Sequence, residues 1–496
     1  MANPPEKKSS LVIAIILSVF AFGYLAFWIL HLYPTLINDE YSALDFVYRA
    51  IKTHDLTPPP HRFYKPYSLI FGFLAFAGGP LAYELVAAAF AAGLVFVFYL
   101  CIRNRLNPGF TILTMLMLIF AVDLFDNTIQ AIVMVPGAFF IFAAAAAGMQ
   151  IPDRPGQWKR YSILGFLGGL ARPESWLLAF PLLWWLFPKN LRQAGRWMLA
   201  PAVIALSAGI WFGKDWLLTH DVLLSLRVAR YDKMIGTGAD FGLGMSLYWF
   251  HHFLSHKLST PFEIFCCLGF MVYVWDHRKQ AHKDPFIVIT VMLFLFLYLS
   301  IWRGLYPQMR FFFPLGVFLL FFAGWLMQRI FIFLTARKLR PAAYILVILL
   351  AAEYFFWCGY RLATVEYKAL SRESEVQKQM VKVADYFRPI LAGKQYRILM
   401  SGRRDEEFSW LLRDLPVQHF TDFREAYYFN LFEGKNFLDF DPQWIVWLPN
   451  DFQYEGVNEM FTWLNYQDRT ELSGHVIELQ KTINDFRIFT VNQTVQ

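Results

Sequence analysis

The chain of 496 residues is 57% hydrophobic and 19% aromatic but only 17% charged, which excludes an ordinary soluble domain of this size. Its net charge of +7 does not indicate nucleic acid, because Lys and Arg concentrate in short connecting segments, as membrane orientation alone requires. The four cysteines lie in or beside apolar runs, so no disulfide framework is expected.

The first apolar run, "LVIAIILSVFAFGYLAFWILHLY" at 11–33, is long enough to cross a bilayer. The segment "HLYPTLINDEY" at its end is bulky and acidic, unlike the small-residue site at which a signal peptide is cleaved. We therefore expect a retained first membrane helix, with Asp39 and Glu40 just beyond its end.

Eleven apolar runs are expected to span the membrane: 11–33, 81–101, 110–124, 128–148, 161–172, 175–187, 197–213, 258–275, 285–302, 312–334 and 341–360. Connectors such as "CIRNRLN" and "DHRKQAHK" are basic, which places them and the N-terminus in the cytoplasm. Joining the two short runs at 161–187 would put the flanking basic loops on opposite sides. We therefore predict two short helices there, and a C-terminus outside the cytoplasm.

The first outer loop is expected to cover 34–80 and to carry interfacial helices. Its segment "YSLIFGFLAFAGG" at 67–79 is apolar but too short to span, which is typical of a helix lying in the membrane interface. A second long outer loop is expected at 214–257.

After Tyr360 the composition becomes that of a soluble protein. "RESEVQKQMVKVADYF" has a helical pattern, and "YRILMSG", "QWIVWLP", "HVIELQ" and "FRIFTV" are typical of strands. The sequence therefore predicts a polytopic all-α membrane domain at 1–361 and a small extracytoplasmic α/β domain at 362–496.

Charged residues of the spanning segments gather toward the outer helix ends on this topology. They are Glu84, Asp123, Asp126, Arg172, Glu174, Lys214, Asp215, Glu263, Arg303, Arg310 and Glu353. A transporter would place such groups near the midplane, between related halves, and neither pattern is visible. We interpret Glu84, Asp123, Asp126 and Glu263 as interfacial anchors that reach water.

Three landmarks follow in order: "NDEYSALDFVYRAI", "GGLARPESWLLAFPLLWW" and "YPQMRFFFPLGVFLLFFAGWL". Together with "YKPYSLIFGFLAFAGGPLAYELV" they resemble the large membrane glycosyltransferases of the GT-C fold. The resemblance is to the bacterial branch related to protein O-mannosyltransferases and to the enzymes that add sugars to lipid A or wall glycans. It covers residues 11–360 as a match of order and topology.

The resemblance implies that an acid of the first outer loop, Asp39, is the catalytic base, with Glu40 as its supporting neighbour. Such a base suits the chemistry, because an acceptor hydroxyl that attacks the anomeric carbon of a polyprenyl-phosphate sugar must lose its proton. The alternative interpretation of this pair is a solvated loop start.

The leaving lipid phosphate requires cations at the headgroup level. Arg310 matches the arginine that the family carries ahead of a late helix, and Arg172 of "ARPE" is the second candidate. Lys65 and Arg303 are further phosphate candidates, and either could instead pair with lipid headgroups. Glu174, Tyr306 and His61 are expected in supporting roles.

No metal or other cofactor is expected. His252 and His256 have a spacing that can bind zinc, but no third outer ligand is placed by the sequence. Some members of the superfamily that this chain resembles use a divalent cation bound by the first-loop acids, which is the alternative here. Because Asp39 and Glu40 are adjacent, without a separated D-x-D, we expect metal independence. "RRDEEF" at 403–408 is interpreted as a solvated face, and no nucleotide-binding motif is present in that region.

The sequence thus favours an inverting transferase that moves a monosaccharide from a polyprenyl-phosphate donor to a lipid, glycan or protein acceptor. We expect it in a bacterial inner membrane, with its site on the extracytoplasmic side. Two alternatives stay open: a transferase that moves an oligosaccharide or phospho-group between lipids, and a non-enzymatic transporter of lipid-linked sugars.

Overall fold

The computed structural model describes residues 4–36, 38–52, 54, 65–151, 154–186, 191–222, 243–302, 309–401, 404–415, 419–423, 436–449 and 460–493. These residues form two compact units, and the division does not follow chain order. The first unit is Met1–His31, Pro58–Phe71 and Leu81–Ala369. The second is Leu32–Thr57, Gly72–Pro80 and Leu370–Gln496, so the segment after the first helix belongs to the same unit as the C-terminal region.

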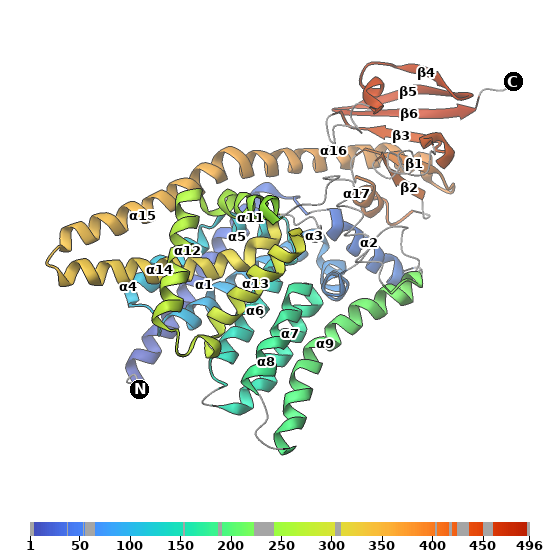
Figure 1. Cartoon of the computed structure of the whole chain (residues 1–496). Coiled ribbons are helices and arrows are strands. Elements are labelled where there is room, and N and C mark those ends of the chain that lie inside the picture. Colours follow the sequence, from blue (N-terminus) through green and yellow to red (C-terminus); the bar gives the residue numbers. More distant parts are fainter. Residues whose placement is uncertain are drawn as a thin grey trace. The chain divides into compact units, whose positions relative to one another are not determined.

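The first unit is helical (Figure 1). Its helices are α1 (Pro4–Leu32), α3 (Pro66–Ile102), α4 (Pro108–Ile119), α5 (Val122–Ile129), α6 (Met134–Gly148), α7 (Trp158–Ala171), α8 (Ala179–Trp185), α9 (Leu191–Thr219), α11 (Leu243–Leu258), α12 (Thr260–Asp276), α13 (Pro285–Trp302), α14 (Phe313–Ala336) and α15 (Arg340–Arg361). Short helical turns are η1 (Pro155–Gln157), η2 (Pro173–Leu178), η3 (Ala281–Lys283), η4 (Met309–Phe312) and η5 (Leu362–Glu366). Each apolar run expected to span contains helix.

Six helices of the described chain are long and apolar enough to cross a membrane, and the number is eight if each bent pair is one span. The bent pairs are α4 with α5, at 42°, and α11 with α12, at 105°. The other expected spans form α6, α7 and α8, of 15, 14 and 7 residues, which are too short to cross a bilayer alone. The protein is therefore a mostly helical membrane protein.

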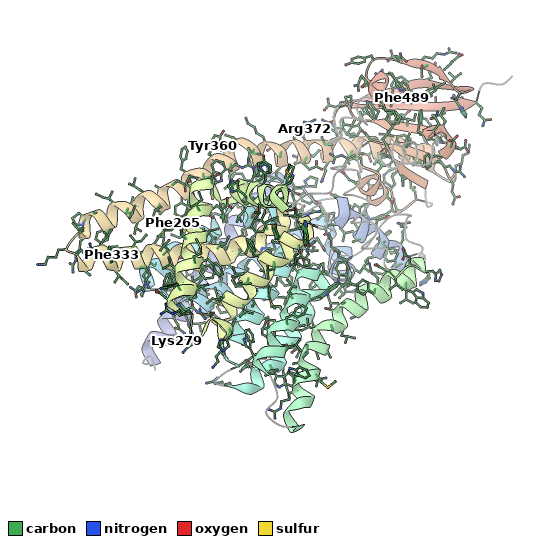
Figure 2. All side chains as sticks on the ribbon, in the orientation of Figure 1. Phe265, Lys279, Phe333, Tyr360, Arg372 and Phe489 are labelled. Atoms are coloured by element: carbon green, nitrogen blue, oxygen red, sulfur yellow. The ribbon has the colours of Figure 1, made fainter. Side chains whose placement is uncertain are left out.

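Packing between these helices relies on small residues and aromatic rings. A Cβ atom on Gly324 of α14 would lie 2.0 Å from Oγ1 of Thr114 on α4, so only glycine allows this close approach. Phe142 of α6 stacks on Phe318 of α14, with 4.1 Å between ring centroids. Apolar side chains such as Phe333 and Tyr360 instead project from the bundle and are more than half exposed, as expected for a lipid-facing surface (Figure 2).

Helix α3 is kinked at the end of the expected interfacial segment. Gly79 has φ 69° and ψ −170°, a backbone conformation that favours glycine, and Pro80 follows it. The run "YSLIFGFLAFAGG" therefore forms a helix that ends at a kink before the long apolar part of α3 begins.

The second unit contains a mixed six-stranded sheet with the order β2-β1-β3-β6-β5-β4. Its elements are α2 (Asn38–Lys52), α16 (Tyr367–Leu391), α17 (Arg404–Leu411), β1 (Arg397–Met400), β2 (His419–Asp422), β3 (Trp444–Trp447), β4 (Arg469–Leu472), β5 (His475–Ile483) and β6 (Phe486–Gln493), with short turns η6 (Phe437–Phe440) and η7 (Thr462–Asn465). Strands β2, β1 and β3 are parallel and the remaining pairs are antiparallel. The expected helix and four strands are confirmed, whereas β2 and β4 were not expected.

Apolar side chains cover both faces of this sheet. On one face, Phe387 of α16 and Phe408 of α17 pack with Val446 and Ile488. On the other face Trp447 is fully buried with Phe461, and its indole N–H donates to Asn465 Oδ1 at 2.7 Å. The sheet therefore has a core on each side.

The Trp447→Ala substitution should destabilise the sheet by about 3–5 kcal/mol, because it removes a large buried ring and leaves a cavity. Amide hydrogen exchange of β3 and β6 in the full chain measures this loss of local stability. The control is Tyr466→Ala, because Tyr466 is 79% exposed and its loss should change exchange by less than about 0.5 kcal/mol. Equal effects of the two substitutions would contradict the assigned core.

Candidate functional site

The two acids of the first landmark lie in the first turn of α2. Negative charge is favourable there because it faces the positive end of the helix dipole. The Glu40 side chain is fully buried, so the alternative of a solvated loop start is wrong for this residue. The side chain of Asp39 lies outside the described residues.

The remainder of α2 is amphipathic and packs on α17 of the second unit. Ser409 donates to Asp45 Oδ2 at 2.7 Å, and Arg49 pairs with the same carboxylate at 2.8 Å. Burial raises the pKa of Asp45, although Arg49 and the Ser409 hydrogen bond both act in the opposite direction. The Arg413 guanidinium lies 4.2 Å from the ring centroid of Trp410.

The second landmark forms an ion pair. Arg172 donates from Nε to Glu174 Oε2 at 3.0 Å and from Nη2 to Glu174 Oε1 at 2.6 Å, a bidentate arrangement. Arg172 is extended, with φ −148° and ψ 133°, because the following Pro173 disfavours helical backbone at this position. The chain thus turns from α7 into η2 with both charges buried against each other.

The second and third landmarks meet at this pair. The Arg172 guanidinium lies over the ring of Phe311, 4.4 Å from its centroid, and Arg310 precedes that ring in η4. Gly137 of α6 lies against the same arginine, since a Cβ there would come within 2.8 Å of Arg172 Cγ. The structure therefore brings Arg172, Glu174 and the Arg310 segment together.

A second ionic cluster joins α5, α11 and α15. Lys257 pairs with Asp123 at 2.5 Å, and both side chains are buried. Asp126, one turn further along α5, accepts a hydrogen bond from Gln130 Nε2 at 2.7 Å. Arg361 pairs with Glu366 at 2.9 Å and hydrogen-bonds His256. These contacts join α5 to α11, and α15 to α11 and η5.

The expectation of water-reaching anchors is wrong for three acids. Asp123, Glu84 and Glu263 are 7%, 0% and 6% exposed, because helices cover them. Glu263 also pairs with His251 at 2.8 Å. Lys257, Arg361 and Glu366 were not anticipated as site residues, since charges beside helix breaks have the same sequence pattern whether buried or solvated.

The other expected residues divide between described and undescribed segments. Lys65 is buried, and it caps α3 directly before Pro66. Arg303, Tyr306 and His61 lie outside the described residues. Of the described candidates, Glu40 belongs to the second unit, and Lys65, Arg172, Glu174 and Arg310 belong to the first.

His252 and His256, the possible zinc ligands, lie close together, but His256 contacts a cation. The rings of His252 and His256 are 6.2 Å apart, and His256 bonds the cationic Arg361, which disfavours a metal ion beside it. With Ser259 and Glu353 they border a cavity of about 340 Å³. Within the described ranges, no group of three or more His, Cys, Asp or Glu residues is placed to hold a metal.

Comparison with known proteins identifies the fold. No family model and no curated protein matches this sequence. ArnT from Cupriavidus metallidurans, crystallised bound to undecaprenyl phosphate, is similar over 96% of this chain and 97% of its own, with a TM-score of 0.56 and 12% identity. The apo oligosaccharyltransferase of Archaeoglobus fulgidus is similar over 88% of this chain and 69% of its own, with a TM-score of 0.54 and 11% identity. The expected GT-C-like fold is confirmed.

The Lys257→Met substitution should lower the stability of the first unit by about 3–5 kcal/mol, because it leaves Asp123 buried without its cation. The double variant Asp123→Asn with Lys257→Met should recover most of the loss, since neither charge then remains. The measurement is the thermal unfolding midpoint of the detergent-purified protein. A double variant no more stable than Lys257→Met would contradict the pairing.

A pH effect is expected from Asp45. Its raised pKa means that the folded chain binds this proton more tightly than the unfolded chain, where the usual value is about 3.9. The carboxyl therefore stabilises the fold below about pH 4, and this contribution is lost as the pH rises through the folded-state pKa. The unfolding midpoint of the wild type, relative to Asp45→Asn, should fall as the pH rises above about 4. A relative midpoint that rises would contradict the assignment.

Proposed function

We propose that this chain is an inverting glycosyltransferase that moves a monosaccharide from a polyprenyl-phosphate donor to an extracytoplasmic acceptor. The observation that carries the proposal is the fold shared, over nearly the whole of both chains, with a protein crystallised bound to undecaprenyl phosphate. The second support is the position of Arg310 in η4, next to the Phe311 ring that Arg172 covers, since a lipid-linked phosphate requires cationic partners.

The proposal includes the orientation and the number of spans. Eleven crossings require α6, α7 and α8 to cross as short helices beside longer neighbours, and α7 to α9 do pack side by side (Figure 1). Basic connectors, including the turn with Lys279 between α12 and α13 (Figure 2), then face the cytoplasm. The region 362–496 lies outside, which is consistent with a bacterial inner membrane.

In the proposed reaction the acceptor oxygen attacks the anomeric carbon from the face opposite the phosphate. The new bond forms as the anomeric carbon–oxygen bond to phosphate breaks, and its electron pair leaves on the phosphate oxygen, so the configuration inverts. The hydroxyl proton passes to the Asp39 carboxylate, and Glu40 supports that base. No metal or other cofactor is required for this balance.

Arg310 is the proposed principal partner of the donor phosphate. Arg172 is already bidentate with Glu174, so it contributes less net charge and holds the Phe311–Arg310 segment in place. Lys65 and Arg303 are proposed as further phosphate contacts, with Tyr306 and His61 in support.

The likeness to the archaeal oligosaccharyltransferase favours a second candidate, transfer of a preassembled oligosaccharide. The likeness to ArnT covers 96% of this chain and 97% of ArnT, against 88% of this chain and 69% of the oligosaccharyltransferase, so we favour transfer of a monosaccharide. The mass that is transferred distinguishes the two candidates.

The proposal predicts that purified protein, given polyprenyl-phosphate sugars and membrane-extract acceptors, adds one hexose or pentose to a product detected by mass spectrometry. Asp39→Asn should lower kcat about 10²- to 10⁴-fold through loss of the base. Arg310→Gln should raise the KM for the donor about 10- to 100-fold through loss of a charged phosphate contact.

The matched control is Lys279→Gln, an exposed cation in the α12–α13 turn, which should leave both constants unchanged. A donor that crosses the membrane intact would favour the transporter, and transfer of an oligosaccharide or phospho-group would favour the other transferase. Full activity in Asp39→Asn would contradict the assigned base.

A further inference from the structure

One buried glutamine contacts both sides of the short segment that carries the two acids. Gln377 of α16 is 1% exposed. Its Nε2 donates to the backbone carbonyl of Leu36 at 2.9 Å, and its Oε1 accepts from the Tyr41 hydroxyl at 3.2 Å. Residues 37–40, with Asp39 and Glu40, lie between these two contacts.

The same face of α16 makes two further contacts that fix this arrangement. The Ser374 hydroxyl donates to the carbonyl of Tyr33 at 3.4 Å. Glu373 accepts from Gln377 Nε2 at 3.1 Å and from both terminal nitrogens of Arg404, at 2.5 and 3.0 Å. The glutamine is therefore oriented by an ion pair that ties α16 to α17.

The burial of Arg404 corrects the expectation that the segment 403–408 is a solvated face. The segment "RRDEEF" was interpreted as solvated, yet Arg404 and Glu407 are buried. Arg404 pairs with Glu373, and its Nη1 lies 3.6 Å from Glu407 Oε2. The guanidinium thus offsets the charge of two neighbouring carboxylates.

We propose that Gln377 is a positioning residue for the acids of α2. This inference rests on the proposed function, in which Asp39 takes the acceptor proton. A neutral amide can donate to a carbonyl and accept from a hydroxyl at the same time, whereas an ionised glutamate cannot donate and a methionine has no N–H or O–H donor. Because the amide is buried, its bonds to the Leu36 carbonyl and to the Tyr41 side chain tie the chain on both sides of residues 37–40 to α16. The C-terminal region thus sets the geometry of the base without contacting the substrate.

The chain offers a matched control on the same helix. Gln379 is also buried, at 7% exposure, and its Nε2 donates to Asp485 Oδ2 at 3.0 Å, in the turn between β5 and β6. The substitutions Gln377→Ala and Gln379→Ala each remove a buried amide from α16. Only the first removes contacts to residues 36 and 41.

The test measures kcat, donor KM and amide hydrogen exchange for both variants. Gln377→Ala should lower kcat about 10- to 100-fold with an unchanged KM, because the base is misplaced rather than the donor site weakened. It should also speed exchange at residues 36–42. Gln379→Ala should leave kcat and exchange at 36–42 as in the wild type, and Tyr41→Phe should show a smaller loss of kcat than Gln377→Ala.

The outcomes separate this inference from the proposed function. If the wild type transfers sugar and Gln377→Ala keeps its kcat, or loses no more than Gln379→Ala, the positioning role is overturned and the proposed function stands. If the wild type transfers nothing, the proposed function is overturned. Unchanged exchange at 36–42 in Gln377→Ala overturns the positioning role irrespective of activity.

Discussion

Charged side chains that are buried in an apolar helix bundle must be paired, and this requirement constrains how the helices of the first unit pack. Lys257 joins α11 to Asp123 of α5, and Arg361 pairs with Glu366 where α15 continues into η5. Arg172 and Glu174 pair across the short turn between α7 and η2. The Arg172–Phe311 contact then connects that turn to the Arg310 segment. Within this unit, the second landmark is thus held by an ion pair, and a cation–π contact joins it to the third.

In the second unit, long-range contacts hold α2, the short helix that follows the first membrane helix. Helix α2 packs on α17. Gln377 of α16 contacts Leu36 before the first turn of α2 and Tyr41 after it. The acids near the N-terminus of the chain therefore depend on residues more than 330 positions away, as the separation of 336 between Tyr41 and Gln377 shows. Under the proposed function, this gives the C-terminal region a role in positioning the base.

Much of the fold was predictable, because long apolar runs and alternating strands are local patterns. Each expected span contains helix, and the four expected strands are present. Strands β2 and β4 were missed because "HFTD" and "RTEL" are four residues long and largely polar, and each occupies an edge of the sheet. The kink in α3 at Gly79 and Pro80 lies where the expected interfacial helix at 67–79 ends and the expected span at 81–101 begins.

The candidate site was less predictable, since pairing between distant charges leaves no local pattern. Arg172 and Glu174 are two residues apart and were found together, whereas the Asp123–Lys257 pair joins different helices and was missed. For the same reason Arg404 looked solvated and proved buried. The roles of Asp39, Glu40, Lys65 and Arg310 stay predictions.

The central proposal is that Arg310 in η4 binds the phosphate of a polyprenyl lipid. The most direct measurement is the equilibrium binding of undecaprenyl phosphate and of undecaprenol to the wild type and to Arg310→Gln in nanodiscs. We predict that the wild type binds the phosphate form at least about tenfold more tightly than the alcohol, and that Arg310→Gln loses most of this difference. Equal affinity of the wild type for both lipids, or an unchanged preference in Arg310→Gln, would contradict the claim.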